Sequence, residues 1–128
     1  MYVKKHVVAV KTNASGDATA YTAEPLNGRI LKIIYTKHPT NSFADGVDFA
    51  ITTEDTKQNL WVESDVNVPK SVCPAEKVQD TNGADIIYTI GEVNFNVYAH
   101  INAAFERVKI VVAAGGDSND GTFTILEG

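Results

Sequence analysis

The sequence predicts an all-β fold, and three observations support that prediction. Val, Ile, Thr, Phe and Tyr are common, whereas the 128 residues include only four Leu and one Met, a bias that favours strands. Apolar and polar residues alternate over several short runs, as expected for strands with one buried face. Turn residues separate these runs at about the 8–12-residue spacing of sandwiches and barrels. We therefore expect residues 1–128 to form a single β-sandwich or jelly-roll-like barrel of about 8–10 mostly antiparallel strands.

Residues 28–37 form the longest strand-like run and are expected to be the central strand. Turn signals stand on both sides, Asn27-Gly28 before the run and His38-Pro39 after it. Alternation places Leu31, Ile33 and Tyr35 on one face and Ile30 and Ile34 on the other. Because both faces carry apolar residues, the sequence predicts a strand that is covered on both sides.

The other expected strands are short alternating runs between turn residues. In chain order they are residues 3–12, 17–23, 47–52, 59–65, 86–88, 93–99, 107–113 and 122–126. The first two are expected to form a hairpin through residues 13–16, and the last two through the glycine-rich loop at residues 115–121. In the last two, the residues expected to face the core are Val108, Ile110, Val112, Phe123 and Ile125. Residues 102–106 are expected to turn the chain.

Regularity fails in residues 66–85, which are expected to be a long irregular loop or arm. Two prolines, Cys73 and an Asn82-Gly83 turn lie there. A loop of this length in a compact domain is usually functional or packs on a neighbour. Its scattered valines, together with the strands that are apolar on both faces, predict a homo-oligomer or a domain that docks on a larger protein. The interface candidates are Tyr2, Ile30, Ile34, Trp61, Val68, Val72 and Tyr88.

The charge and the cysteine content argue against several classes of protein. Sixteen acidic and eleven basic residues give a formal net charge of -5 at pH 7. Nucleic-acid binding is not expected, since the basic residues are scattered and phosphate contacts need clustered positive charge. No apolar run approaches the length of a membrane span, and the N-terminal apolar segment is too short for a signal peptide. With one cysteine there is no intramolecular disulfide, so we expect synthesis in a reducing cytoplasm and no export by secretion.

No arrangement of residues predicts catalysis, a cofactor or a metal site. The segment from Asp117 to Gly121 resembles a calcium loop, but the EF-hand pattern fails at its fifth and twelfth positions, which are Gly121 and Gly128. The histidines lack the spacing of metal ligands and are His6, His38 and His100. Cys73 lies in a loop, without the helix that often activates a nucleophilic cysteine. We therefore expect a protein that is not an enzyme.

Two aromatic residues keep a carbohydrate-binding module open as an alternative. Trp61, the single tryptophan, falls on the same strand face as Glu63 and is either a sugar platform or a core or interface residue. Tyr98 is the second candidate platform. A glycan array without hits would remove this alternative.

Several segments resemble a group of small structural proteins of tailed bacteriophages. They are residues 13–21 (NASGDATAY), 27–35 (NGRILKIIY), 43–51 (FADGVDFAI), 106–112 (ERVKIVV), 115–117 (GGD) and 121–123 (GTF). The similarity covers most of the chain and consists of turn and strand signatures. It implies a virion protein, with capsid decoration (cementing) as the expected role and a neck or tail component as the alternative.

The resemblance also implies partners and a location. It implies binding to other copies of the chain, with a trimer favoured over a dimer, and to the major capsid protein at the capsid surface of the virion, after synthesis in the host cytoplasm. Identical patches that meet at a rotation axis are a common basis of such assemblies. No cofactor, nucleic acid or membrane is expected as a partner.

Overall fold

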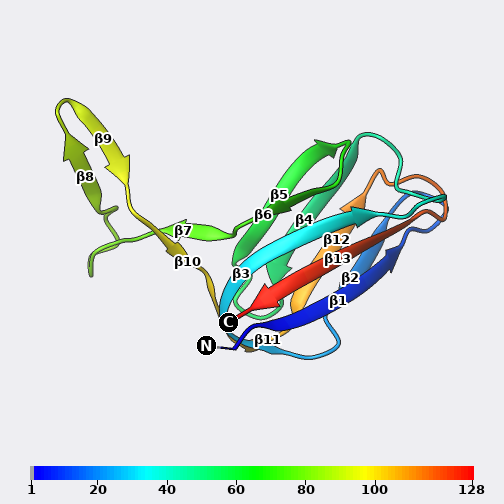
Figure 1. Cartoon of the computed structure of the whole chain (residues 1–128), viewed down its shortest axis with the longest axis horizontal. Helices are drawn as coiled ribbons and strands as arrows, with labels where there is room; N and C mark the ends of the chain where they lie inside the picture. The colour runs from blue at the N-terminus through cyan, green and yellow to red at the C-terminus, as the bar shows by residue number, and fades with distance from the viewer. Residues whose placement is uncertain (1) are drawn as a thin grey trace.

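The structure is a computed structural model that describes residues 2–128, and these residues contain strands but no helix. The prediction of an all-β fold is confirmed. Two antiparallel sheets face each other, and a thin arm leaves one end of this body (Figure 1). The strands are β1 (Lys4–Lys11), β2 (Ala18–Tyr21), β3 (Leu26–Lys37), β4 (Val47–Thr53), β5 (Asn59–Val66), β6 (Lys70–Val72), β7 (Ala75–Lys77), β8 (Ile87–Ile90), β9 (Val93–Asn96), β10 (Tyr98–His100), β11 (Asn102–Glu106), β12 (Val108–Ala113) and β13 (Asp120–Glu127).

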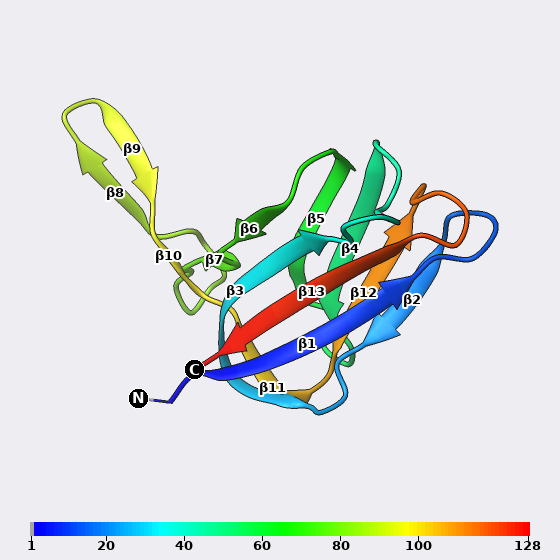
Figure 2. The same cartoon turned by 45° about the vertical axis from the view of Figure 1, so that its right-hand side comes forward.

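The two layers of the body are separate sheets. The first has the order β1–β13–β3, and the far edge of β3 is shared by the short strands β6 and β11. The second has the order β2–β12–β4–β5. Figure 2 shows the first sheet lying in front of the second, with the arm to one side. Because β3 has partners on both edges, the prediction that residues 28–37 are a central strand is confirmed.

The core lies between the sheets and contains an aromatic cluster. Phe49 is at its centre, with the rings of Tyr35, Phe123 and Trp61 at centroid distances of 4.8, 4.9 and 5.3 Å. These pairs have the edge-to-face geometry that aromatic rings favour. The residues predicted to face inward in the last two strands are all 0% exposed and are Val108, Ile110, Val112, Phe123 and Ile125.

A bulge in β3 changes which of its residues face the core. The pairing of β3 with β13 skips Leu31, and an extra residue in one strand shifts the side chains beyond it to the other face. Ile30 and Ile33 therefore both point inward, and each is 0% exposed. The prediction that Ile30 shares an outer face with Ile34 is wrong, because strict alternation does not hold across a bulge.

Three predicted connections are also wrong, and two of them fail because the chain changes sheet. The turn at residues 13–16 leads from β1 to β2, which pairs with β12 in the second sheet. The loop at residues 115–121 leads back from β12 to β13 in the first sheet. Both loops meet at one corner, where the Gly115 N–H donates to the Gly16 carbonyl oxygen (2.9 Å). Crossing loops and hairpin loops use the same turn residues, so composition does not separate them. The third, residues 102–106, is strand β11, which pairs with β3.

The arm is an insertion into one edge strand of the first sheet. In β6, Val72 lies opposite Ile33, so an uninterrupted strand would place residue 75 opposite Ile30. Ile101 occupies that place instead, because the Ile30 N–H donates to its carbonyl oxygen (2.9 Å). The chain thus leaves the edge strand after Pro74 and returns in the same register 26 residues later (101 minus 75).

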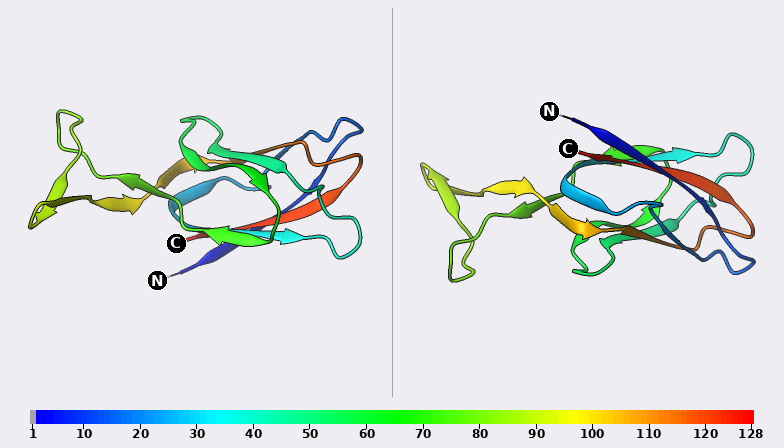
Figure 3. Two further views of the ribbon diagram at one scale, coloured as in Figure 1. Left: turned by 90° about the horizontal axis from the view of Figure 1, so that it is seen from above. Right: turned by 90° about the horizontal axis from the view of Figure 1, so that it is seen from below.

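Residues 75–100 form the arm, which the sequence placed too early, at residues 66–85. β7 pairs with β10 at its base, and β8 pairs with β9 at its tip. In the views from above and below, the arm extends away from the body (Figure 3). Residues 93–99, which were predicted as one strand of the body, are divided between β9 and β10 in the arm.

Tyr35 carries a buried hydroxyl group whose removal is expected to be harmless. Its side chain is 1% exposed, and the hydroxyl has no hydrogen-bond partner among the described residues; burial raises the pKa of this phenol. Tyr35→Phe therefore loses no hydrogen bond and keeps the ring contacts. We expect the free energy of unfolding to stay equal or rise by up to about 1 kcal/mol. Urea unfolding followed by Trp61 fluorescence measures it.

The control for this prediction is Tyr35→Ala, which also removes the ring. Its free energy of unfolding is expected to fall by about 3–5 kcal/mol, as for other large aromatic residues of protein cores. If Tyr35→Phe alone lost more than about 1 kcal/mol, the hydroxyl would be making a hydrogen bond in solution and the prediction would be wrong.

Candidate interaction surface

The hairpin at the tip of the arm has one apolar and one mainly polar face. In the register of β8 with β9, Tyr88 lies opposite Phe95 and Ile90 opposite Val93. Alternation places these four side chains on one face, which we call the arm face. The opposite face carries Ile87, Thr89, Asn94 and Asn96, and the Thr89 hydroxyl donates to the Asn94 side chain (2.8 Å).

No described part of the chain covers the arm face. Its side chains are 49–60% exposed: Tyr88 60%, Ile90 58%, Val93 56% and Phe95 49%. All residues from 79 to 100 are exposed, and β8 and β9 pair only with each other. A lone two-stranded hairpin is at best marginally stable in water, and a contiguous exposed apolar patch commonly marks an interaction site. The arm face is therefore the leading candidate for a functional surface.

The sequence-based interface candidates are divided among surface and core. Tyr2, Val68 and Tyr88 are exposed, at 85%, 60% and 60%. Ile34 and Val72 are half-buried, and Val72 packs against the core. Ile30 and Trp61 are wrong as interface candidates, since they are 0% and 6% exposed and lie in the core. Of the seven, only Tyr88 belongs to the arm face.

Three residues of the arm face were missed, although a signal for them was present. Val93 and Phe95 alternate with polar residues, and Ile90 continues the apolar face in β8. That alternation was interpreted as a half-buried strand of the body. An amphipathic strand looks the same in sequence whether its apolar face is covered by its own chain or by another protein, so only the structure separates the two cases.

Trp61 does not offer a platform to a sugar. Its indole is 6% exposed and packs edge-on against Phe49. The indole N–H donates to the Glu63 carboxylate (3.0 Å). Leu60 is an extra residue in the pairing of β5 with β4, and this bulge places both Leu60 and Trp61 in the core. Tyr98, the second proposed platform, is 59% exposed and lies in the arm.

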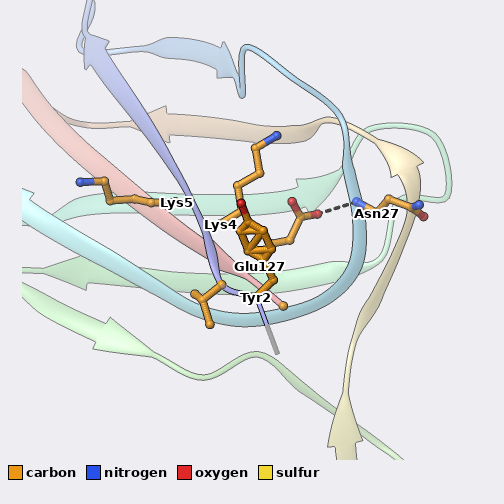
Figure 4. A pocket seen from close by; sticks show the side chains of 7 residues that line it. Tyr2, Lys4, Lys5, Asn27 and Glu127 are labelled. Carbon is orange, nitrogen blue, oxygen red and sulfur yellow. Dashed lines mark hydrogen bonds between the residues drawn. The ribbon is translucent and has the colours of Figure 1, made fainter.

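An open hollow of about 630 Å³ lies beside the two ends of the chain. Tyr2, Lys5, Asn27 and Glu127 are among its lining residues (Figure 4). The Glu127 carboxylate accepts a hydrogen bond from the Asn27 backbone N–H and lies 3.1 Å from Nε2 of the buried His6. Both carboxylate oxygens thus hold neighbouring strands together, which indicates a structural role for Glu127.

The remaining sequence candidates do not assemble into a reactive site. Within residues 2–128, no group of three or more His, Cys, Asp or Glu side chains is arranged to hold a metal ion. Cys73 is exposed near the base of the arm. Asp117 accepts a hydrogen bond from the Ser118 hydroxyl (2.8 Å) in the loop that crosses between the sheets. In the described residues, no helix has the length and apolarity needed to span a membrane.

An ion pair joins the β4–β5 turn to Arg107, which stands between β11 and β12. Arg107 donates two hydrogen bonds to the Glu54 carboxylate (2.8 and 2.6 Å). Its guanidinium carbon lies 4.4 Å from the centre of the Tyr21 ring. The hydrogen bonds from Arg107 lower the pKa of Glu54. This geometry is a bidentate pair stacked on an aromatic ring, which fixes side chains in place.

The carboxylate of Glu106 accepts hydrogen bonds from the same turn. Its side chain is 3% exposed, and one carboxylate oxygen accepts the backbone N–H groups of Asp55 and Thr56 (3.0 Å each). The Thr56 hydroxyl also donates to this carboxylate. Burial acts to raise the pKa of Glu106, but these hydrogen bonds outweigh it, and the pKa lies below its ordinary value.

Glu106→Gln is expected to lower the free energy of unfolding by about 1–2 kcal/mol near neutral pH, because hydrogen bonds to a charged acceptor are weakened. The folded-state pKa is depressed, so the carboxylate's contribution is complete above the unfolded-state pKa near 4.5 and is lost as pH falls through the folded value. The difference between wild type and variant should therefore shrink as pH falls below about 4.5. Denaturant unfolding at several pH values measures it.

Glu76→Gln is the matched control for that prediction, because Glu76 is exposed in the arm. Glu76→Gln should leave the free energy of unfolding unchanged at every pH. The difference in free energy of unfolding between wild type and Glu106→Gln could instead stay constant down to pH 3. That result would contradict a role for the ionised carboxylate.

Comparisons with known proteins give little beyond the geometry. No protein-family model matches the chain, and no curated protein matches it. Among solved structures, the chain is similar to an exo-β-1,3-galactanase from Phanerochaete chrysosporium, solved with galactose, at 14% sequence identity and a TM-score of 0.30. The match covers 96% of this chain but only 27% of the galactanase chain. A similarity at this level carries no conclusion about function.

Proposed function

We propose that this chain is a non-enzymatic structural protein of a tailed-bacteriophage virion, and that it decorates the capsid by binding the major capsid protein. The arm face carries the proposal. It presents two aromatic and two aliphatic side chains, each 49–60% exposed, on a hairpin that has no core of its own. Such a hairpin gains its stability when another subunit covers it, and this is the behaviour of a protein that works by assembly.

The body supports the same proposal. Its two sheets enclose a well-packed aromatic core, and the charged groups Glu54, Glu106 and Arg107 stabilise a turn. We assign no catalytic role to any of them. The phage context comes from the resemblance of short segments, at residues 13–21, 27–35, 43–51, 106–112, 115–117 and 121–123, to small structural proteins of tailed bacteriophages. A carbohydrate-binding function is not proposed, because Trp61 lies in the core.

The stoichiometry of purified particles tests the proposal. Virions of the phage that encodes the chain are purified, and the ratio of this protein to the major capsid protein is measured by gel densitometry and quantitative mass spectrometry. A decoration protein is expected at a copy number comparable with that of the capsid protein. A small, fixed number of copies would place the chain in the neck or tail instead, and absence from the particle would overturn the proposal.

A further inference from the structure

We propose that the arm face of one copy docks on the outer face of the β1–β13–β3 sheet of a second copy. The inference deepens the proposed function, because it names the partner that covers the arm. It rests on that function only in assigning the arm to assembly, and it applies to the purified protein without any capsid.

The outer face of the β1–β13–β3 sheet has Val7 and Ile34 on either side of Thr124 in its middle row. Its middle row runs across the three strands as Val7, Thr124 and Ile34, which are aligned by the strand registers. Val7 is 56% exposed. The row on one side of the middle row contains small or β-branched residues, Ala9, Thr122 and Thr36. The row on the other side contains Lys5, Leu126 and Lys32. A face of this kind accepts a second sheet packed against it at about 10 Å.

The charges of the two surfaces are complementary. The outer face carries Lys5, Lys11 and Lys32 against the single acid Asp120. No ion pair joins these lysines to an acid within residues 2–128. The arm is acidic, since residues 75–100 contain Glu76, Asp80, Asp85 and Glu92 but only Lys77 as a base. Asp85 lies 3.6 Å from Lys77, and Glu92 stands in the turn between β8 and β9, next to the arm face. The negative charge of the arm therefore favours its approach to the lysines of the outer face.

The outer face of the second sheet is a poorer match. Its apolar row includes Val111, Ala50 and Val62, but its charges balance, with Lys109 opposite Thr52 at one end and Asp48 opposite Ala113 at the other. The same apolar area is therefore available there without a positive rim. This difference makes Val62, which is 62% exposed, a matched control for Val7.

The direction of the arm makes the contact intermolecular. The arm leaves the edge of the first sheet at β6 and β11 and points away from the body in every view (Figures 1 and 3). It does not lie back on its own β1–β13–β3 face. Each copy thus offers its arm face and, at a different place, the outer face of its β1–β13–β3 sheet, which we call the receptor face. A contact between two different surfaces of identical chains is heterologous. Such contacts close into a ring or extend as a chain.

Two double variants test the two sides of the contact separately. Tyr88→Ser with Phe95→Ser removes the aromatic residues of the arm face. Lys5→Glu with Val7→Glu places negative charge on exposed positions of the receptor face. Wild type is expected to be an oligomer at micromolar concentration by sedimentation velocity and light scattering, and each double variant a monomer, with the dissociation constant raised at least about 100-fold. Circular dichroism and thermal unfolding confirm that each variant is folded.

Mixing the two variants gives the decisive result. One keeps an intact receptor face and the other an intact arm, so a 1:1 mixture should form a heterodimer through one remaining contact. Arm-to-arm association would give no heterodimer and would overturn the proposal. The controls Ile87→Ser, on the opposite face of the hairpin, and Val62→Glu should leave the oligomer intact; a loss as large as that of the test variants would also overturn it.

This experiment separates the inference from the proposed function. A chain that self-associates through the arm but is absent from virions keeps the inference and removes the proposed function. A wild-type chain that is monomeric in solution, yet abundant in the particle, overturns the inference and assigns the arm to the major capsid protein.

Discussion

Deletion of residues 75–100, with Pro74 joined directly to Ile101, is expected to give a folded sandwich that no longer self-associates. The deletion removes the whole arm but no buried side chain of the body. The two ends of the deleted segment are already neighbours, because Ala75 lies opposite His100 at the base of the arm. The new junction thus closes a gap that the fold has already brought together.

The register of β3 explains why this deletion should be tolerated. Ile101 takes the place opposite Ile30 that residue 75 would have in an uninterrupted strand. Removing 26 residues therefore fuses β6 and β11 into one continuous edge strand. Pro74 is acceptable there, since prolines are tolerated in edge strands. Removing a long excursion also lowers the entropy cost of closing the chain.

The expected result is a monomer whose free energy of unfolding is within about 1 kcal/mol of that of the full chain, compared under conditions in which both are monomeric. Sedimentation gives the oligomeric state and urea unfolding gives the stability. The matched control removes one residue more, residues 75–101, and so shifts β11 by one position against β3, which turns its side chains to the opposite face. It also deletes the buried Ile101 and should yield unfolded or aggregated protein. An unfolded 75–100 variant would show that the arm is part of the folding unit.

The sequence predicted the sandwich well because burial and alternation coincide in its regular strands. In β12 and β13, buried and half-buried positions alternate without interruption, and every residue expected to be inward is buried. Prediction failed where the period changes. Bulges at Leu31 and Leu60 moved Ile30 and Trp61 into the core, and nothing in their residue types marks a bulge.

The arm could not be located from sequence for a different reason. Its strands have the composition of half-buried strands, and the edge strand that it interrupts is divided into two pieces only three and five residues long. Neither piece carries a strong pattern by itself. The relation between them depends on their common partner β3, which precedes both in the chain. Such long-range pairing is a property of the folded chain, and local periodicity does not record it.

Phe49→Ala is expected to cause the largest loss of stability among single substitutions in the body. The ring is 2% exposed, lies on β4, and contacts aromatic rings from both sheets. Replacing a buried Phe by Ala leaves a cavity and costs about 3–5 kcal/mol. Domains are commonly stable by only about 5–15 kcal/mol, so the variant should unfold at a much lower urea concentration.

The surroundings of Phe49 place the expected loss of unfolding free energy at the upper end of the range of about 3–5 kcal/mol. Its neighbours Tyr35 and Phe123 are held by β3 and β13, which pair with each other in the first sheet. They have little freedom to move into the space, because each is also packed against the other at a centroid distance of 5.4 Å. The cavity therefore stays open, and the cost of such a substitution grows with the cavity that remains.

Phe105→Ala is the matched control, since Phe105 undergoes the same chemical change at a position that is 71% exposed. The φ of residue 105 is +54°, which is unfavourable for Phe and for Ala alike. Backbone strain therefore does not change when Phe105 is replaced by Ala. We expect a change within about 0.5 kcal/mol. Urea unfolding followed by Trp61 fluorescence applies to both, because the indole lies 5.3 Å from the Phe49 ring. Equal losses in the two variants would mean that the body does not enclose Phe49 as the structure places it.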